Sequence, residues 1–139
     1  MMINSCIYNK IIHKCSSVSV ETGGIIGGNN DVVQKFCFDK GVEGITLGCY
    51  IPDVDLLVTN LFKWQKRGIE FMGIAHSHTN EYQNLSSNDR NYIREIMMAM
   101  PQEKNMLYFP IVYSKSIHSY KAVRDRDELY ISNDDVILI

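Results

Sequence analysis

The chain has 139 residues, of which 45% are hydrophobic, and a formal net charge of −2 at pH 7. This length predicts a single domain over residues 1–139, large enough to bury roughly two-thirds of the surface that the unfolded chain exposes. The slight negative charge provides no basic surface, which argues against nucleic acids and anionic membranes as partners.

Two further features of the sequence indicate the cellular compartment. The first residues do not form a basic segment followed by an apolar one, and no apolar run approaches the ~20 residues that span a bilayer. The cysteines, Cys6, Cys15, Cys37 and Cys49, show no close metal-binding spacing, and a domain of this size needs no disulfides. We therefore expect free thiols and a cytoplasmic protein that does not bind membranes.

The first third of the chain predicts a helix followed by paired strands. Apolar residues recur every four positions around residues 5–15, which predicts an amphipathic helix that Asn4 or Ser5 can cap. Residues 18–28 predict a strand whose glycines mark a bulge or a place where another group approaches the backbone. Turn residues then lead into a strand over residues 32–38, so we expect a hairpin.

The next segment predicts a strand and a helix. Residues 45–51 form an apolar run typical of a third strand. A helix then begins at Pro52-Asp53, carries apolar residues at helical spacing and ends before Gly68. Trp64 in this helix fits a packing residue, with a place on a recognition surface as the alternative.

The following strand and helix contain the residues of greatest chemical interest. A short apolar run over residues 69–75 predicts a strand. A second long helix begins at Ser86 and ends at Pro101, and we interpret its methionines as flexible filling of the core.

The end of the chain predicts further strands. Residues 106–113 and 117–123 fit two strands, and Pro110 requires an edge position or a bulge in the first of them. A charged turn follows at residues 124–127, and the apolar run at residues 136–139 predicts a last short strand that docks on the core, with a homodimer contact as the alternative. The elements together predict an α/β (α+β) layer fold with a mixed, mostly antiparallel central sheet flanked by helices.

A candidate metal site lies where the strand over residues 69–75 ends. His76 and His78 are two residues apart, so in an extended chain their imidazoles project to the same face and can hold one metal ion. Asp89 can be the third ligand, because a loop can return the first turn of the next helix toward the histidines. Imidazole and carboxylate suit zinc, and three protein ligands plus water form a catalytic rather than a structural site, which indicates hydrolysis.

The same residues also have a structural interpretation. A His-x-His pair often occurs without a metal, and Ser86 with Asp89 three positions later is close to a helix capping box. The two interpretations are compatible, because a capped helix start is a rigid place to mount a ligand.

Three separated segments resemble the JAMM motif of the MPN/JAB (JAB/Mov34) zinc metalloprotease family. The segments are Glu21-Thr22-Gly23-Gly24-Ile25-Ile26-Gly27, His76-Ser77-His78 and Ser86-Ser87-Asn88-Asp89. The spacing from His76 to Asp89 and the order of elements over nearly the whole chain both fit this pattern. The resemblance implies a JAB/MPN domain with layering similar to that of cytidine deaminases, and the short chain resembles the compact prokaryotic branch of the family.

The resemblance also implies roles for five residues. His76, His78 and Asp89 match the ligands of one zinc ion per chain, and Glu21 matches the carboxylate that takes a proton from the attacking water and returns it to the leaving amine. Ser86 matches the serine that stabilises the oxyanion of the tetrahedral intermediate. The implied activity is that of a zinc metallopeptidase acting as an isopeptidase.

The family also suggests the substrate. Its members cleave after the C-terminal diglycine of ubiquitin-like proteins, or of sulfur-carrier-type proteins with the same tail, so we expect such a protein as partner. The tail would bind as an extended strand along an exposed sheet edge, for which residues 44–50 are a hypothesis. Thr79 stands where the family usually has proline, which predicts a looser loop but no lost ligand.

Two other functions compete with this prediction. The chain could be a non-catalytic MPN-type interaction scaffold, although all five motif positions are retained. It could also be another zinc amidohydrolase, such as a nucleobase deaminase, but the His-x-Glu and Pro-Cys-x-x-Cys segments of those enzymes are absent from the sequence. His13 and His118 fit surface or structural roles.

Overall fold

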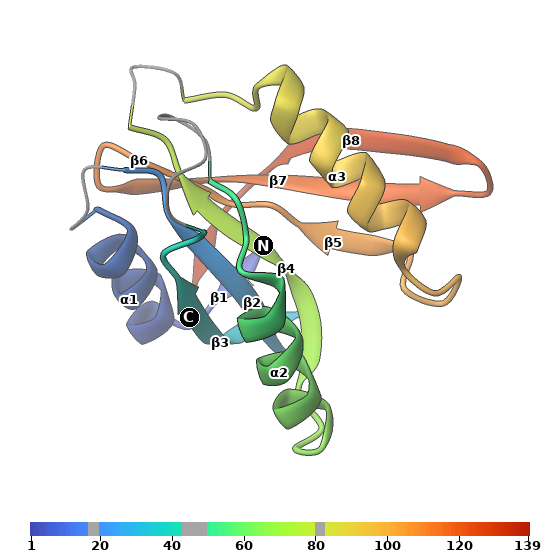
Figure 1. The fold of residues 1–139 in the computed structure, drawn as a ribbon, viewed down its shortest axis with the longest axis horizontal. Helices are drawn as coiled ribbons and strands as arrows, with labels where there is room; N and C mark the ends of the chain where they lie inside the picture. The colour runs from blue at the N-terminus through green and yellow to red at the C-terminus, as the bar shows by residue number, and fades with distance from the viewer. Residues whose placement is uncertain (17–19, 43–49, 80–82) are drawn as a thin grey trace.

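The structure, a computed structural model, describes residues 1–16, 20–42, 50–79 and 83–139 (Figure 1). In these residues it contains three helices, α1 (Ser5–Ser16), α2 (Val54–Gln65) and α3 (Ser87–Ala99). The strands are β1 (Met2–Ile3), β2 (Gly23–Asn29), β3 (Val32–Asp39), β4 (Glu70–Ser77), β5 (Met106–Tyr108), β6 (Ile111–Tyr113), β7 (Ser116–Asp125), β8 (Glu128–Asp134) and β9 (Ile137–Leu138). None of the described helices is long and apolar enough to cross a bilayer.

All described strands belong to one sheet, and β4 lies near its middle. The strand order is β5-β7-β6-β4-β2-β3-β1-β9, and β8 pairs with β7. Strand β2 is antiparallel to both β3 and β4, and β7 is antiparallel to β5, β6 and β8. Among the described strands, the pairings of β1 with β3 and β9 and those of β4 with β5 and β6 are parallel, and the others are antiparallel. The predicted mixed, mostly antiparallel sheet is therefore confirmed.

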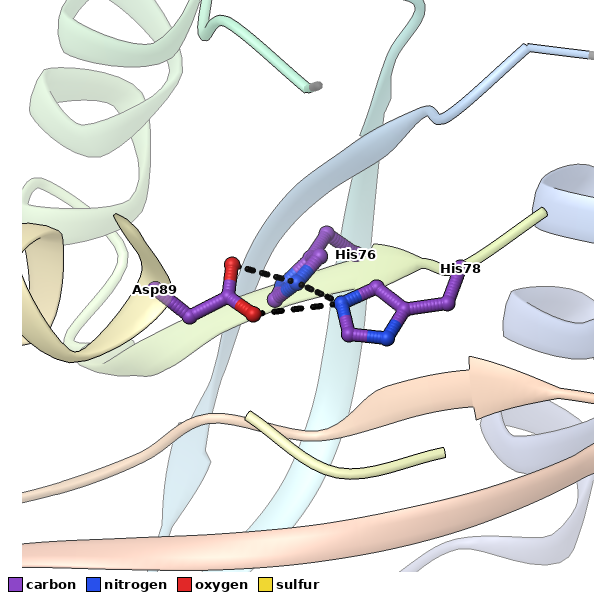
Figure 2. Close-up of side chains that lie close together, drawn as sticks. All are labelled: His76, His78 and Asp89. Carbon is purple, nitrogen blue, oxygen red and sulfur yellow. Dashed lines mark hydrogen bonds and ion pairs between the residues drawn. The ribbon is translucent and has the colours of Figure 1, made fainter. Parts of the chain in front are cut away.

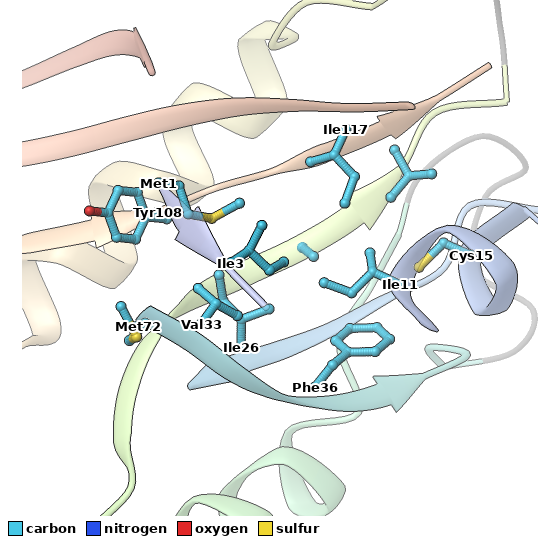
Figure 3. Packing of buried hydrophobic residues seen from close by; sticks show 12 residues of the cluster. Met1, Ile3, Ile11, Cys15, Ile26, Val33, Phe36, Met72, Tyr108 and Ile117 are labelled. Carbon is cyan, nitrogen blue, oxygen red and sulfur yellow. The ribbon is translucent and has the colours of Figure 1, made fainter. Parts of the chain in front are cut away.

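Helices cover both faces of the sheet, as predicted. On one face α1 packs through Ile11 and Cys15 in a cluster that includes Ile26 of β2 (Figure 3). On the other face α2 and α3 pack through Trp64 and Met97 against a second cluster. The alternation of side chains along β2 and β4 divides neighbouring apolar residues between the two faces and so produces two cores from one sheet.

The three predicted helices are present, with caps that the sequence indicated. Asn4 accepts a hydrogen bond of 2.9 Å from the Cys6 N–H at the start of α1, and Asp53 accepts one of 3.2 Å from Leu56 N–H at the start of α2. Trp64 is buried, which confirms its packing role. The apolar stripe of α2 is only partly used, because Val54, Val58 and Phe62 remain exposed.

The last third of the chain differs from the prediction at Pro110, at Arg124 and at β8. The expected strand over residues 106–113 is interrupted at Phe109-Pro110, giving β5 and β6. Pro110 is buried inside the sheet, so an edge position is wrong, and the break between β5 and β6 falls where proline has no N–H to donate to the sheet. Arg124, expected in a charged turn, is buried at the end of β7, and β8 was not predicted as a separate strand.

The terminal apolar run forms the predicted short strand and docks on the rest of the fold. Its backbone pairs with β1, with the N–H groups of Ile137 and Ile139 bonded to the carbonyls of Met1 and Ile3 at 2.9 and 3.0 Å. Val136 is partly buried and packs against the core cluster that contains Ile3, whereas the side chains of Ile137, Leu138 and Ile139 are 51–56% exposed. The run therefore extends the sheet edge and docks on the core through Val136, as predicted. The homodimer contact stays a prediction.

One part of the prediction falls largely outside the described residues. Residues 45–49 of the third strand, residues 44–49 of the hypothetical substrate edge, and Cys49 are not described. Ile51, the end of the predicted strand, is described and is not part of a strand. The described cysteines are free thiols, as predicted.

Candidate metal centre

The end of β4 presents two histidines to the same side of the chain. His76 lies in β4, and the main-chain N–H groups of His76 and His78 donate to the carbonyls of Pro110 and Val112 at 3.1 and 3.0 Å. These bonds keep the backbone extended through His78, so the two imidazoles project together (Figure 2). Their Nε2 atoms are 3.0 Å apart.

The first turn of α3 brings Asp89 to the histidines. Ser86 is the N-cap of α3: its Oγ accepts a hydrogen bond of 3.1 Å from the Asp89 N–H, and the Ser86 N–H donates to Asp89 Oδ2 at 2.7 Å. This is the capping box that the sequence indicated. The same carboxylate faces the imidazoles, so capping and the candidate ligand role coexist in one side chain.

The three donor groups form a compact triangle. Asp89 Oδ1 lies 3.1 Å from His76 Nε2, and Asp89 Oδ2 lies 3.2 Å from His78 Nε2 (Figure 2). Zinc held tetrahedrally at ~2.0–2.1 Å from each donor separates them by about 3.3 Å. The triangle therefore fits zinc after a small outward movement, and its two imidazoles and one carboxylate are donors that zinc prefers.

The electrostatics of the triangle favour a charged carboxylate. The exposed fractions of the His76, His78 and Asp89 side chains are 12%, 5% and 18%. Burial alone would raise the pKa of Asp89, but hydrogen bonds from both imidazoles and from Ser86 together hold the pKa well below its usual range. An ionised carboxylate is the form that binds a cation.

Strand pairing brings Glu21 to this triangle from far away in the sequence. Gly23 of β2 is the register partner of His76, and the Ser77 N–H donates to the Thr22 carbonyl at 2.8 Å. Continuing this antiparallel pairing sets Glu21 across from His78. Gly23 is needed for the close fit, because a Cβ there would lie 2.4 Å from the Ala75 carbonyl oxygen.

Glu21 is half-buried and interacts with the other site residues. Burial raises the pKa of its carboxyl, the imidazoles of His78 and His76 oppose that rise, and the Asp89 carboxylate adds to it. A hydrogen bond from the Tyr50 backbone also favours the charged form, and the net result is a raised pKa. A carboxylate with a raised pKa beside a metal site is suited to accept and return protons.

A buried aspartate that the sequence did not single out supports this arrangement. Asp39, at the end of β3, accepts hydrogen bonds from the Tyr50 hydroxyl at 2.6 Å and from the N–H groups of Gly41 and Asp53 at 2.8 Å each. The Tyr50 ring stacks parallel to the His76 ring, with centroids 6.5 Å apart. The sequence signal for this role is an Asp-x-Gly turn at residues 39–41 that precedes the Pro-Asp helix start at residues 52–53.

The remaining candidate residues lie as follows. Thr79 is exposed directly after His78, in a segment without regular structure. His13 is exposed on α1, and His118 is half-buried on β7 with its Nε2 3.2 Å from the Ser116 Oγ. Neither belongs to the cluster of potential metal ligands found among the described residues.

Comparison with known proteins identifies the fold. No protein-family model and no curated protein matches the sequence. The chain is similar to a solution structure of a protein from Desulfitobacterium hafniense, with a TM-score of 0.68 and 16% identity, over 99% of this chain and 92% of that one. It is similar to a JAB1/MPN domain protein from Archaeoglobus fulgidus, with a TM-score of 0.53 and 15% identity, over 100% and 96% of the two chains.

A third similar structure is described as JAMM, a metalloprotease-like zinc site in the proteasome and signalosome. It has a TM-score of 0.50 and 12% identity, over 100% of this chain and 97% of that chain. These similarities confirm the predicted JAB/MPN fold.

Proposed function

Starting from the JAB/MPN fold, we propose that this chain is a cytoplasmic, zinc-dependent metalloprotease of the JAMM type. Its substrate is a ubiquitin-like or sulfur-carrier-type protein, which it cleaves after the C-terminal diglycine. The single observation that carries the proposal is the cluster of His76, His78 and Asp89, whose donor atoms all lie within 4.8 Å of one another. These three residues would hold one zinc ion per chain.

A metal ion at this site would act as a Lewis acid toward water and toward the substrate carbonyl. A zinc ion held by these three ligands would lower the pKa of a bound water to about 7 and polarise a carbonyl group. Glu21 takes the proton from the attacking water and returns it to the leaving amine. Its half-buried position opposite His78 and its raised pKa support this role.

Ser86 provides a hydroxyl next to the proposed ligand Asp89. Its Oγ accepts the Asp89 N–H, which leaves the hydroxyl proton available for a second partner. We assign that proton to the oxyanion that develops on the substrate carbonyl, a type of interaction typically worth ~10²- to 10³-fold in kcat.

The test is hydrolysis of a defined substrate. A ubiquitin-like protein ending in diglycine is joined to a lysine side chain, to a cysteine or to a following peptide, and incubated with the zinc-loaded protein. We expect release of the free diglycine terminus from at least one conjugate and no release after chelation. Intact conjugates in the presence of bound zinc would contradict the proposal and favour a scaffold.

A further inference from the structure

A cavity opens directly beside the proposed zinc ligands. It has a volume of about 220 Å³, and His76 and Asp89 form part of its lining. An apolar cavity of ~150 Å³ in a protein holds a benzene ring, so this one has room for a leucine, methionine or phenylalanine side chain.

The rest of the described lining is almost wholly apolar. Residues 50–52 form one wall, Tyr92 and Ile93 of α3 contribute to another, and Ile74 and Phe109 complete the surface. Burying an apolar group against such a lining is favourable, whereas a charged group would lose its hydration there without gaining a partner from these apolar side chains.

The wall at residues 50–52 is held in place by hydrogen bonds to its polar groups. The Tyr50 hydroxyl points to the buried carboxylate of Asp39, and the Asp53 N–H donates to the same carboxylate. The Val42 N–H also donates to the Ile51 carbonyl at 3.0 Å. With its polar groups paired in this way, the ring of Tyr50 can line the cavity while it stacks against His76.

We propose that this cavity binds the side chain of the residue that directly follows the scissile bond, and that this residue is apolar. The inference rests on the proposed function. In the proposed substrate, the two residues before the scissile bond are glycines, which have no side chain to fill a cavity next to the metal. The side chain must therefore come from the leaving-group side. Tyr50 supports this placement, because its ring lines the cavity and its backbone forms a hydrogen bond with Glu21. Glu21 is the residue that returns the proton to the leaving amine, so the cavity and the leaving group lie on the same side of the site.

The substrate class that follows is a peptide fusion in which diglycine is followed by leucine, methionine or phenylalanine. The test uses fusions of one ubiquitin-like protein in which leucine, phenylalanine, glycine or aspartate follows the diglycine. With zinc bound, we expect kcat/KM for the leucine and phenylalanine fusions to exceed that for the glycine and aspartate fusions by about 10- to 100-fold. Equal rates for all four would overturn the cavity assignment alone, whereas no cleavage of any fusion would overturn the proposed function and this inference with it.

A pair of variants on α3 tests whether the substrate side chain binds in this cavity. Asn88 is exposed and lines the cavity, so Asn88→Trp can fill it without displacing the core. Asn91 is exposed on the same helix and is not part of the lining, which makes Asn91→Trp the matched control. We expect Asn88→Trp to keep its zinc and lose the preference for leucine over glycine, and Asn91→Trp to keep both. An unchanged preference in Asn88→Trp would show that the side chain binds elsewhere.

Discussion

The Oγ of Ser77 lies 3.0 Å from the main-chain N–H of Thr22, although 55 residues separate the two in the sequence. The same hydroxyl lies 3.3 Å from the Thr22 carbonyl oxygen, and both residues are buried. This contact joins the residue between the two histidines to the residue after Glu21. It therefore fixes the proposed proton carrier relative to the proposed zinc ligands.

Replacing Ser77 with alanine removes the acceptor of a buried N–H without touching a proposed ligand. We expect the free energy of unfolding to fall by about 1–3 kcal/mol, because the Thr22 N–H is left unpaired. We also expect kcat/KM to fall about 10-fold or more while zinc content stays the same. Ser119→Ala is the matched control, since Ser119 is also buried in the sheet but its Oγ bonds only weakly to the Met1 sulfur at 3.8 Å. Full activity in Ser77→Ala would show that the contact does not position Glu21.

Glu21→Gln tests the proton-transfer role. The amide keeps the size of the side chain but cannot carry a proton between water and amine, so we expect turnover to fall by about 10²- to 10⁴-fold with zinc still bound. Glu70→Gln is the control, because Glu70 lies at the other end of β4 with an exposed side chain paired to Lys104. Zinc content and turnover measured on the same samples separate the two effects. Undiminished hydrolysis by Glu21→Gln would remove Glu21 from this role.

Asp39→Asn tests the hydrogen bonds that hold Tyr50. Asp39 Oδ2 accepts from both the Tyr50 hydroxyl and the Asp53 N–H, and an amide nitrogen at that position cannot accept. We expect a loss of about 1–3 kcal/mol in urea unfolding and reduced hydrolysis, since Tyr50 packs against His76 and bonds to Glu21. Asp31→Asn, in the exposed turn before β3, should leave both unchanged. Stability equal to wild type in Asp39→Asn would show that the network is dispensable.

The sequence predicts the proposed metal ligands because they lie close together along the chain. His76, His78 and Asp89 are close in the chain, and strand and helix periodicity alone suggest that they meet. Glu21 was assigned only through the family resemblance, since its proximity depends on the pairing of β2 with β4. Asp39 was missed for a related reason: its partners Tyr50 and Asp53 come from a separate segment, and no local pattern links them to it.

The fold was predictable where apolar residues recur with a clear helical or strand period. The helices have clear apolar stripes and capping residues, and the hairpin of β2 and β3 has a strong turn signal. Two-residue strands such as β1 carry no periodic signal, because they are defined by their partners. Arg124 was misjudged because a charged residue near a turn is usually exposed, whereas here its guanidinium binds carbonyls at the end of α3.

That arginine provides a stability test away from the site. Its guanidinium donates to the carbonyls of Met97, Met100 and Pro101 at 2.6–3.3 Å, where α3 ends without a residue in the left-handed conformation. Arg124→Met keeps the apolar part of the side chain and leaves these carbonyls unpaired, so we expect a loss of about 2–4 kcal/mol. Arg94→Met on the exposed face of α3 should change stability by less than ~0.5 kcal/mol. Equal thermal unfolding of the two variants would contradict this role.

Metal content tests the central claim most directly. The protein is purified without chelator, and zinc per chain is measured for the wild type, for His78→Ala and for His13→Ala, in which an exposed histidine on α1 is removed. We predict one zinc per chain in the wild type and in His13→Ala, and none in His78→Ala, with the circular dichroism spectrum unchanged in all three. A zinc-free wild type, or one zinc per chain in His78→Ala, would contradict a metal centre formed by His76, His78 and Asp89.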